Sequence, residues 1–233
     1  RCKASITGGA WQTRIGDNHA HAGQTVILNL DHTPFYAEQG GQVSDVGQIR
    51  AKNGAVKITH VERVTHPLGH VILHHGVVTE GKIIGGGEEC EAIVSKVHRI
   101  PTMQNHTSTH ILNWALREVL GEHVQQKGSL VDPEKTRFDF SHPKQLGEDD
   151  LAKIEKHVKS QVSNSLPVFT KPDADQKDAR QINTLRAVFG EKYPDKVRVV
   201  SIGADIDAML RDPKNPKWMQ YSVEFCGGTH LKN

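Results

Sequence analysis

The residues His106-Thr107-Ser108-Thr109-His110 are matched far downstream by Cys226-Gly227-Gly228-Thr229-His230. Imidazole and thiolate are ligands that Zn2+ takes in tetrahedral sites, and four such groups complete one tetrahedron. The two clusters can share a metal only if the chain folds so that they meet. The spacing therefore predicts a fold that closes one metal site on His106, His110, Cys226 and His230.

The first cluster is expected near the start of a helix. Asn105 is a candidate N-cap, apolar residues recur at helical spacing from 111 to 119, and Gly121 would end the helix. Side chains at i and i+4 lie on one helix face, so both histidines can reach one ion. The second cluster follows the strand-like run 221–225, and its two glycines would let the backbone turn tightly around a metal.

Thr107 stands where metalloproteases of the HExxH type carry the glutamate that acts as general base. Its presence argues against such a protease. The remaining histidines, His74 and His75 among them, have no cysteine or carboxylate at ligand spacing. We read them as ordinary polar or core residues.

Composition sets broad limits on the class of protein. Hydrophobic residues make up 36% and charged residues 24% of the 233 positions, which is typical of a soluble globular protein. No apolar run approaches the roughly 20 residues of a membrane span, so no membrane partner is expected. Cys2 and Cys90 are expected to be reduced thiols of a cytosolic protein, with a disulfide between them as the minor alternative. The start at Arg1, rather than Met, suggests an excised fragment.

The net charge of +2 is too small to identify a nucleic-acid-binding protein. Local basic groups could nevertheless form a phosphate-facing surface, and a solvated face is the equal alternative. The candidates are Arg137, Lys192, Lys196, Arg198 and Lys217.

Two domains are expected, with a boundary after residue 98. Residues 1–98 hold short strand-like runs separated by glycine turns, which favours a small closed β-barrel. Residues 99–233 mix helices and strands without regular βαβ alternation, which predicts an α+β core around the metal site. Beyond the first helix, this core is expected to contain helices at 151–162 and 173–188, and strands at 137–140, 196–201 and 220–225.

Six motifs, in this order, resemble the editing domain of alanyl-tRNA synthetase, which is shared with the free-standing AlaX trans-editing proteins. The resemblance covers roughly residues 24–231, and the insertion before Tyr221 is more similar to the eukaryotic enzymes than to the bacterial ones. The motifs are Asp31–Gln42 (DHTPFYAEQGGQ), Asn105–His110 (NHTSTH), Gln125–Leu130 (QQKGSL), Arg137–His142 (RFDFSH), Phe189–Tyr193 (FGEKY) and Cys226–His230 (CGGTH).

The resemblance implies hydrolysis of tRNA(Ala) that carries serine, and to some degree glycine, by an aminoacyl-tRNA deacylase. It also implies a translation-protein-like barrel at 1–98, a zinc-binding editing core at 99–233 and a cytoplasmic location, with a mitochondrial form as the alternative. The parent enzyme would be an alanine–tRNA ligase. Its aminoacylation domain and its C-terminal oligomerisation domain are absent from this chain, so we expect no alanine activation and weak tRNA binding.

The resemblance also assigns site residues. Serine is larger than alanine, so the site must sense its hydroxyl by a hydrogen bond rather than by size. The resemblance points to Thr109, Gln126 and Thr33 for this role, with Gln42 as a polar companion. Gly40 and Gly41 would permit close approach of the backbone to the ester or ribose.

Several alternatives stay open at this point. Four protein ligands leave no open position for a zinc-bound water, so the zinc could gain or lose a ligand, position the substrate, or be purely structural. Among these alternatives, zinc that holds the substrate or orders the site is slightly favoured, with a water held by other groups. The chain could also be a zinc-stabilised RNA-binding module without catalysis, or a free-standing AlaX-type editor.

Overall fold

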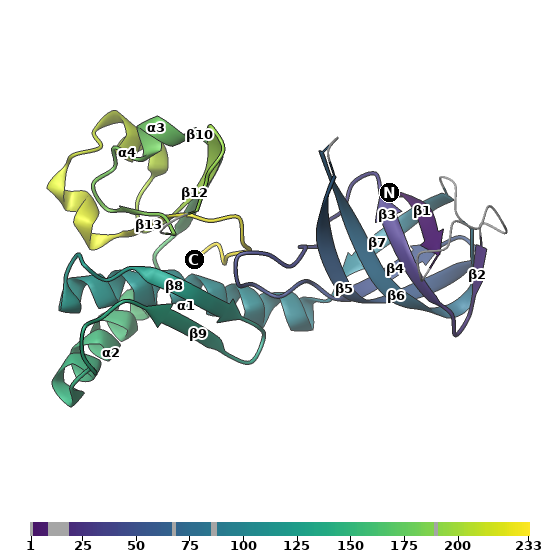
Figure 1. Ribbon diagram of the computed structural model, residues 1–233, viewed down its shortest axis with the longest axis horizontal. Helices are drawn as coiled ribbons and strands as arrows, with labels where there is room; N and C mark the ends of the chain where they lie inside the picture. Colours follow the sequence, from purple (N-terminus) through teal and green to yellow (C-terminus); the bar gives the residue numbers. More distant parts are fainter. Residues whose placement is uncertain (1, 9–18, 67–68, 85–87, 189–190) are drawn as a thin grey trace. The chain divides into compact units, whose positions relative to one another are not determined.

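The computed structural model describes residues 2–8, 19–66, 69–84, 88–188 and 191–233 (Figure 1). It divides into two compact units, Arg1–Pro101 and Thr102–Asn233, which we call the strand unit and the mixed unit. The predicted boundary after residue 98 falls close to this division. The identities predicted for the two domains stay predictions.

The described part of the strand unit contains seven antiparallel strands in one sheet, in the order β2-β6-β3-β1-β7-β4-β5 (Figure 1). Apolar side chains alternate inward along the strands, as in β3, where Val26, Leu28 and Leu30 are buried and the residues between them are not. The strands are β1 (Cys2–Gly8), β2 (His19–His21), β3 (Thr25–Leu30), β4 (Gly47–Ala51), β5 (Gly54–His66), β6 (Gly69–Ile84) and β7 (Glu88–Val94).

The sheet of the strand unit curls back on itself. β5 lies at the end of the strand order beside β4, and it also pairs with β6 over most of its length. β2 pairs only with the last residues of β6 and is left at the edge. The predicted closed barrel is therefore corrected to a curled sheet with an edge strand, while a mixed chain made mostly of strands is confirmed.

An ion pair between the buried Asp45 and the partly exposed Arg99 holds the long connection between β3 and β4. Asp45 is 2% exposed, and its carboxylate accepts hydrogen bonds from Tyr36 N at 2.6 Å and from Arg99 Nε at 2.7 Å. Arg99 also donates to the Pro34 carbonyl at 2.8 Å. Together these contacts hold the DHTPFY segment at Pro34 and Tyr36.

The mixed unit follows and includes most of helix α1 (Lys96–Leu120), which begins before the division. Its strands form a four-stranded sheet, β10-β12-β13-β11, and a β8–β9 hairpin. The elements after α1 are β8 (Gln126–Val131), β9 (Thr136–Phe140), α2 (Glu148–Ser163), β10 (Val168–Asp175), α3 (Gln176–Ala179), β11 (Leu185–Arg186), β12 (Lys196–Ile202), α4 (Ile206–Arg211), the 3-10 helix η1 (Pro216–Gln220) and β13 (Ser222–Phe225).

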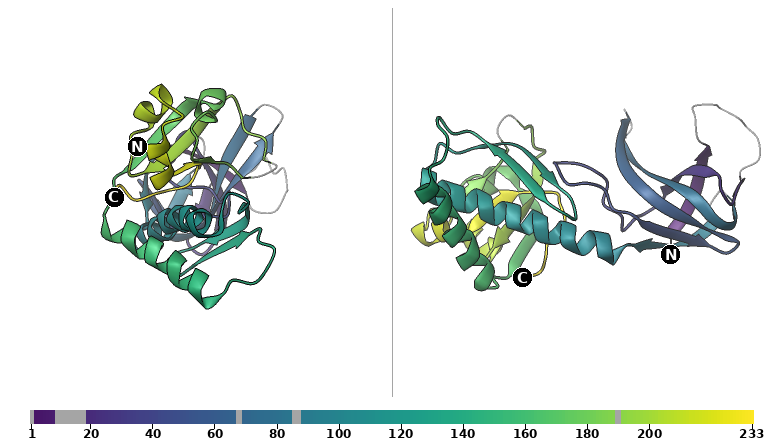
Figure 2. Two further views of the ribbon diagram at one scale, coloured as in Figure 1. Left: turned by 90° about the vertical axis from the view of Figure 1, so that its left-hand side faces the viewer. Right: turned by 90° about the horizontal axis from the view of Figure 1, so that it is seen from below.

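Two apolar clusters support these elements. One joins α1, through Trp114 and Leu116, to Ile154 of α2 and to Phe138 of the hairpin. The views in Figure 2 agree with this packing of α2 and the hairpin beside α1. The other cluster lies on the four-stranded sheet, where Met209 and Trp218 cover its strands. The first cluster holds α1 in place against α2 and the hairpin.

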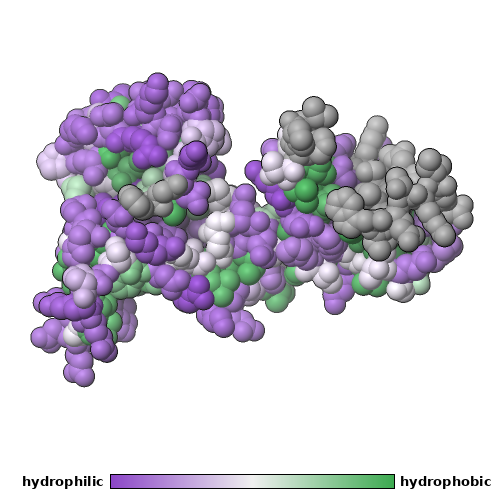
Figure 3. All heavy atoms as spheres, viewed as in Figure 1, coloured by the Kyte–Doolittle hydropathy of each residue, from purple (hydrophilic) through white to green (hydrophobic). Residues whose placement is uncertain are grey.

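The surface is mainly polar on the face drawn in Figure 3, and apolar residues gather mostly inside the units. Within the described ranges, no helix combines the length and the apolar character needed to span a membrane.

Several predicted elements are confirmed, among them helix α2 and strands β9, β12 and β13. The start of α1 was predicted wrongly, because the helix begins at Lys96 and contains Pro101. Asn105 is therefore no N-cap; its side chain donates to the Asp132 carbonyl at 2.8 Å. The helix predicted at 173–188 is also wrong, since β10 extends to Asp175 and only four helical residues follow.

Candidate metal centre

The two ligand clusters meet in the mixed unit. His106 and His110 lie one turn apart on α1, and Cys226 and His230 follow the end of β13. β13 lies between β12 and β11, in a register that sets Phe225 opposite Val199, and Cys226 follows directly at the end of this strand. The potential ligand atoms of all four residues lie within 4.8 Å of one another. The fold thus closes the cluster that the sequence predicted.

The separations within the cluster suit a tetrahedral ion. Cys226 Sγ lies 3.4 Å from His106 Nε2 and 3.3 Å from His230 Nε2. A tetrahedral zinc, with its usual sulfur and nitrogen bond lengths, would hold such atoms about 3.6 Å apart. A small movement of the side chains would therefore complete the coordination shell.

Burial sets the protonation of the cluster. It lowers the pKa of His106 and of His110 to about 3 and that of His230 well below its usual value, because charged imidazoles lose their solvation. Burial also raises the pKa of the Cys226 thiol to about 12. The histidines are thus neutral and can donate a lone pair, while binding a cation would require the thiol to release its proton.

Arg198 holds the loop that carries Cys226. Its Nη1 donates to the carbonyl oxygens of Cys226 and Gly228, at 2.9 and 2.6 Å. The backbone N–H of Gly228 points at Cys226 Sγ, at 3.3 Å. Arg198 was one of the basic residues considered for a phosphate-facing surface, and these contacts give it a local role instead.

His110 has ring nitrogens that no hydrogen bond occupies. Its Nδ1 is buried without a partner among the described residues, and its Nε2 lies 3.6 Å from Glu224 Oε2, beyond hydrogen-bond range. Glu224 is itself fixed by Asn113 Nδ2, which donates to Oε1 at 2.9 Å. A buried imidazole with free lone-pair capacity fits a metal ligand, so the donor set and the geometry both accommodate zinc.

The two predicted site residues of the mixed unit differ in burial and in their hydrogen bonds. Thr109 is buried; its hydroxyl donates to the Asn105 carbonyl at 2.8 Å and lies 2.8 Å from Thr136 Oγ1. Because the Thr109 proton is used, Thr136 must be the donor, and Thr109 keeps one lone pair. Gln126 is half-buried at the start of β8, where its Nε2 donates to Ser129 Oγ at 3.2 Å.

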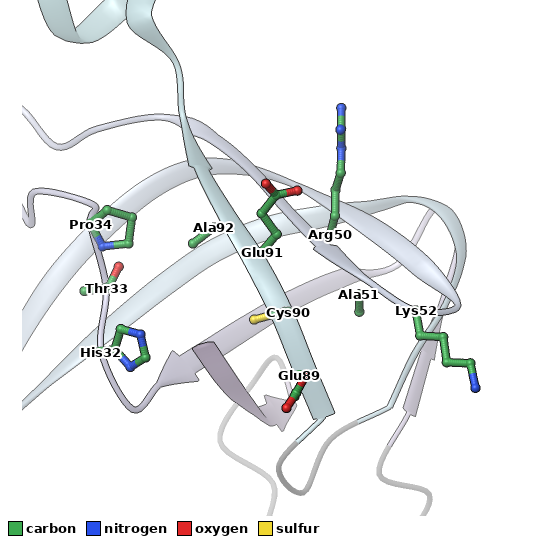
Figure 4. A pocket seen from close by; sticks show the side chains of 10 residues that line it. All are labelled: His32, Thr33, Pro34, Arg50, Ala51, Lys52, Glu89, Cys90, Glu91 and Ala92. Atoms are coloured by element: carbon green, nitrogen blue, oxygen red, sulfur yellow. The ribbon is translucent and has the colours of Figure 1, made fainter. Parts of the chain in front are cut away.

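Thr33 belongs to the strand unit, where it lines a surface pocket of about 1140 Å³ together with the segments 50–52 and 89–92 (Figure 4). Its Oγ1 lies 2.8 Å from Nε2 of His74, a fully buried residue, and accepts from Phe35 N at 3.1 Å. His74 Nδ1 faces the Leu28 carbonyl at 3.0 Å, which can only accept, so Nδ1 carries the proton. Thr33 must then donate to Nε2, which leaves its oxygen as an acceptor.

The remaining predicted residues also lie in the strand unit. Gly40 and Gly41 have φ values of 60° and 85°, a left-handed conformation that glycine adopts without strain. Gln42 is only 1% exposed, so its side chain is enclosed by this unit. Phe189 and Gly190, of the fifth motif, lie outside the described residues.

Sequence reasoning did not identify the supporting contacts of five residues, although it had considered Thr107, Arg198 and Glu224 for other roles. Thr107, Asn113, Arg198 and Glu224 surround the metal ligands, and His74 supports Thr33. A role near the site could have been suspected for Thr107 and Glu224, because they lie one and two residues from a predicted ligand. His74, Asn113 and Arg198 reach their partners only through the folded sheet or helix, so spacing could not identify them.

Comparison with known proteins gives a consistent set of similarities. A family model described as tRNA synthetases class II (A) matches residues 1–96. The chain is 51% identical over 202 residues to an alanine–tRNA ligase of Candida albicans, covering 87% of this chain and 20% of that protein. It is 46% identical to the mitochondrial alanine–tRNA ligase of Saccharomyces cerevisiae over 94% of this chain and 22% of that protein. It is 40% identical to the cytoplasmic enzyme of Dictyostelium discoideum over 98% of this chain and 24% of that protein.

The buried position of His74 predicts a pH dependence of stability. Burial lowers its pKa below the usual 6.5, so below that pH the unfolded chain takes up a proton that the folded chain resists. As the pH falls below 6.5, His74 alone should lower the free energy of unfolding by at most about 1.4 kcal/mol per pH unit, in addition to the effect of the buried histidines of the cluster. Urea unfolding, followed by circular dichroism, should show a smaller fall for His74→Gln. Equal pH slopes for the two proteins would contradict this.

The cluster also predicts metal binding. The wild-type chain should bind one equivalent of zinc, and Cys226→Ala should weaken binding by more than about 100-fold, since a direct ligand is lost. Metal analysis after dialysis and competition with a chromogenic chelator would measure both. Cys90→Ala, which removes the other described free cysteine, is the matched control and should keep its zinc. One full equivalent of zinc on Cys226→Ala would refute the four-ligand site.

Proposed function

We propose that this chain, which belongs to the alanine–tRNA ligase family as a segment about a fifth of the relatives' length, is a hydrolytic editing domain. Its substrate would be tRNA(Ala) mischarged with serine, and secondarily with glycine. The observation that carries the proposal is the buried cluster of three imidazoles and one thiol. The motifs around that cluster, Asn105–His110 and Cys226–His230, agree with it.

The reaction requires water to add to the carbonyl of the aminoacyl ester. The ester C–O bond then breaks, which releases serine and leaves a hydroxyl on the terminal adenosine of the tRNA. Zinc held by His106, His110, Cys226 and His230 would supply positive charge for binding and orienting the substrate. With four protein ligands, the favoured role is ordering the site, and a purely structural zinc is the alternative.

Selection of serine would depend on neutral hydrogen-bonding groups. A site that pairs with a substrate hydroxyl can reject an analogue without it, because its own polar group is then left unpaired. Thr109 retains one acceptor lone pair beside His110, and the amide of Gln126 offers a donor and an acceptor. These features support a hydroxyl-sensing role for both residues.

The predicted residues of the strand unit have binding chemistry of their own. Because Thr33 donates its proton to His74, its oxygen can only accept a hydrogen bond from a ligand. A hydroxyl or an ammonium group could donate that hydrogen bond. The left-handed turn at Gly40 and Gly41 leaves no Cβ between the backbone and a ligand. Gln42 would act as a polar companion from its enclosed position.

The partner would be the acceptor end of tRNA(Ala), in a protein whose other segments carry aminoacylation. Relatives of this chain include cytoplasmic and mitochondrial alanine–tRNA ligases. We propose the cytoplasm as the location, from the similarity to eukaryotic cytoplasmic enzymes.

A deacylation assay tests the function. The purified chain should hydrolyse Ser-tRNA(Ala) faster than Ala-tRNA(Ala), and Gln126→Ala should reduce the serine rate by roughly 100-fold, if it orients the reacting group. Thr109→Val should lower the discrimination between the two substrates. Gln145→Ala, at an exposed position of the mixed unit, is the matched control and should behave as wild type.

The outcome that opposes editing is decay of both substrates at the buffer rate. If the chain then still binds tRNA and zinc, the noncatalytic RNA-binding module would be the better description.

A further inference from the structure

We propose that Thr107 is a positioning residue that fixes the ring orientation and the tautomer of His230. The proposal rests on the metal site described above and does not depend on deacylation. Thr107 is 6% exposed and lies on α1 between the two histidine ligands of the helix.

The two nitrogens of His230 face different partners. Nε2 lies 3.3 Å from Cys226 Sγ, on the side of the ring where a shared metal would be bound. Nδ1 lies 3.3 Å from Thr107 Oγ1. A neutral imidazole carries one proton, so a lone pair on Nε2 places that proton on Nδ1. Nδ1–H must then donate to Thr107, and the reverse direction would block Nε2 for a metal.

A second contact links the same hydroxyl to the loop. The backbone N–H of Leu231 donates to Thr107 Oγ1 at 3.1 Å. The oxygen therefore accepts from both His230 and its neighbour, which uses both of its lone pairs. One helix residue thus holds the end of the ligand loop by its side chain and its backbone. Partners of this kind orient metal-binding imidazoles in many proteins.

Thr107 occupies the helix position at which HExxH metalloproteases carry their glutamate. There, the residue after the first histidine is the general base. Here, both lone pairs of the hydroxyl are occupied, so Thr107 cannot accept a proton from water while it holds His230. The same helix position supports a ligand in place of acting on a substrate.

Zinc affinity, measured on the full chain without tRNA, tests the proposal. Thr107→Val keeps the shape of the side chain but removes the acceptor, and should weaken zinc binding by about 10- to 100-fold. Thr107→Ser keeps the hydroxyl and should stay within about threefold of wild type, as expected if the acceptor is what matters. The absorption spectrum of bound Co2+ should change in Thr107→Val and not in Thr107→Ser. Thr170→Val, at an exposed strand position, should match wild type in every respect.

A measurement on the wild type covers the case in which Thr107→Val fails to fold. The ¹⁵N chemical shifts of His230 in the zinc-loaded chain should show a proton on Nδ1. A proton on Nε2, or equal zinc affinity for Thr107→Val and wild type, would overturn the proposal. Absence of deacylation, with the affinity loss as expected, would count against the editing function alone.

Discussion

The mixed unit depends on one constraint: four polar donors from opposite ends of its sequence must share a small buried volume. His106 and His110 are fixed relative to each other by helix geometry, and Cys226 and His230 by the turn after β13. Each buried imidazole would cost free energy if it had no partner. The hydrophobic clusters on α1 and on the four-stranded sheet provide the rigid support that lets these donors face one another.

The residues around the cluster contact different parts of it. Arg198 holds the backbone of the CGGTH loop through two carbonyls, and Glu224, held by Asn113, lies beside His110. Burial raises the pKa of Glu224 to about 7, with the Asn113 hydrogen bond opposing that shift. The centre is thus a network of neutral imidazoles bounded by one carboxyl group and one guanidinium group. Such a network holds its ligands in one arrangement more firmly than packing alone would.

The sequence predicted the parts of this molecule that local patterns determine. The meeting of His106, His110, Cys226 and His230, the helix α2 and the strand β9 follow from spacing and periodicity. Tertiary contacts decided the rest. The helix was expected to begin near Asn105, yet α1 begins at Lys96 and continues through Pro101. Gly47, in a region expected to contain glycine turns, opens β4, where a Cβ would collide with the Ile93 carbonyl.

The hydrogen-bond partners of the predicted site residues could not be derived from the sequence either. The hydroxyl direction of Thr33 is set by His74, and the hydrogen bond that Thr109 accepts comes from Thr136; both partners are far away in sequence. No spacing rule gives these pairs, because they arise where a strand or a hairpin crosses a loop or a helix. The sequence shows which side chains can form hydrogen bonds. Which of them donates and which accepts could be assigned only from the folded structure.

The β8–β9 hairpin carries an irregularity between Gln126 and Gly128, where the register with β9 shifts by one residue. Side chains in a regular strand alternate between faces, so the extra residue resets which face Gln126 presents. The direction of this side chain is therefore encoded in the length of the segment as well as in its identity. An insertion or deletion there would redirect the amide without altering a single functional group.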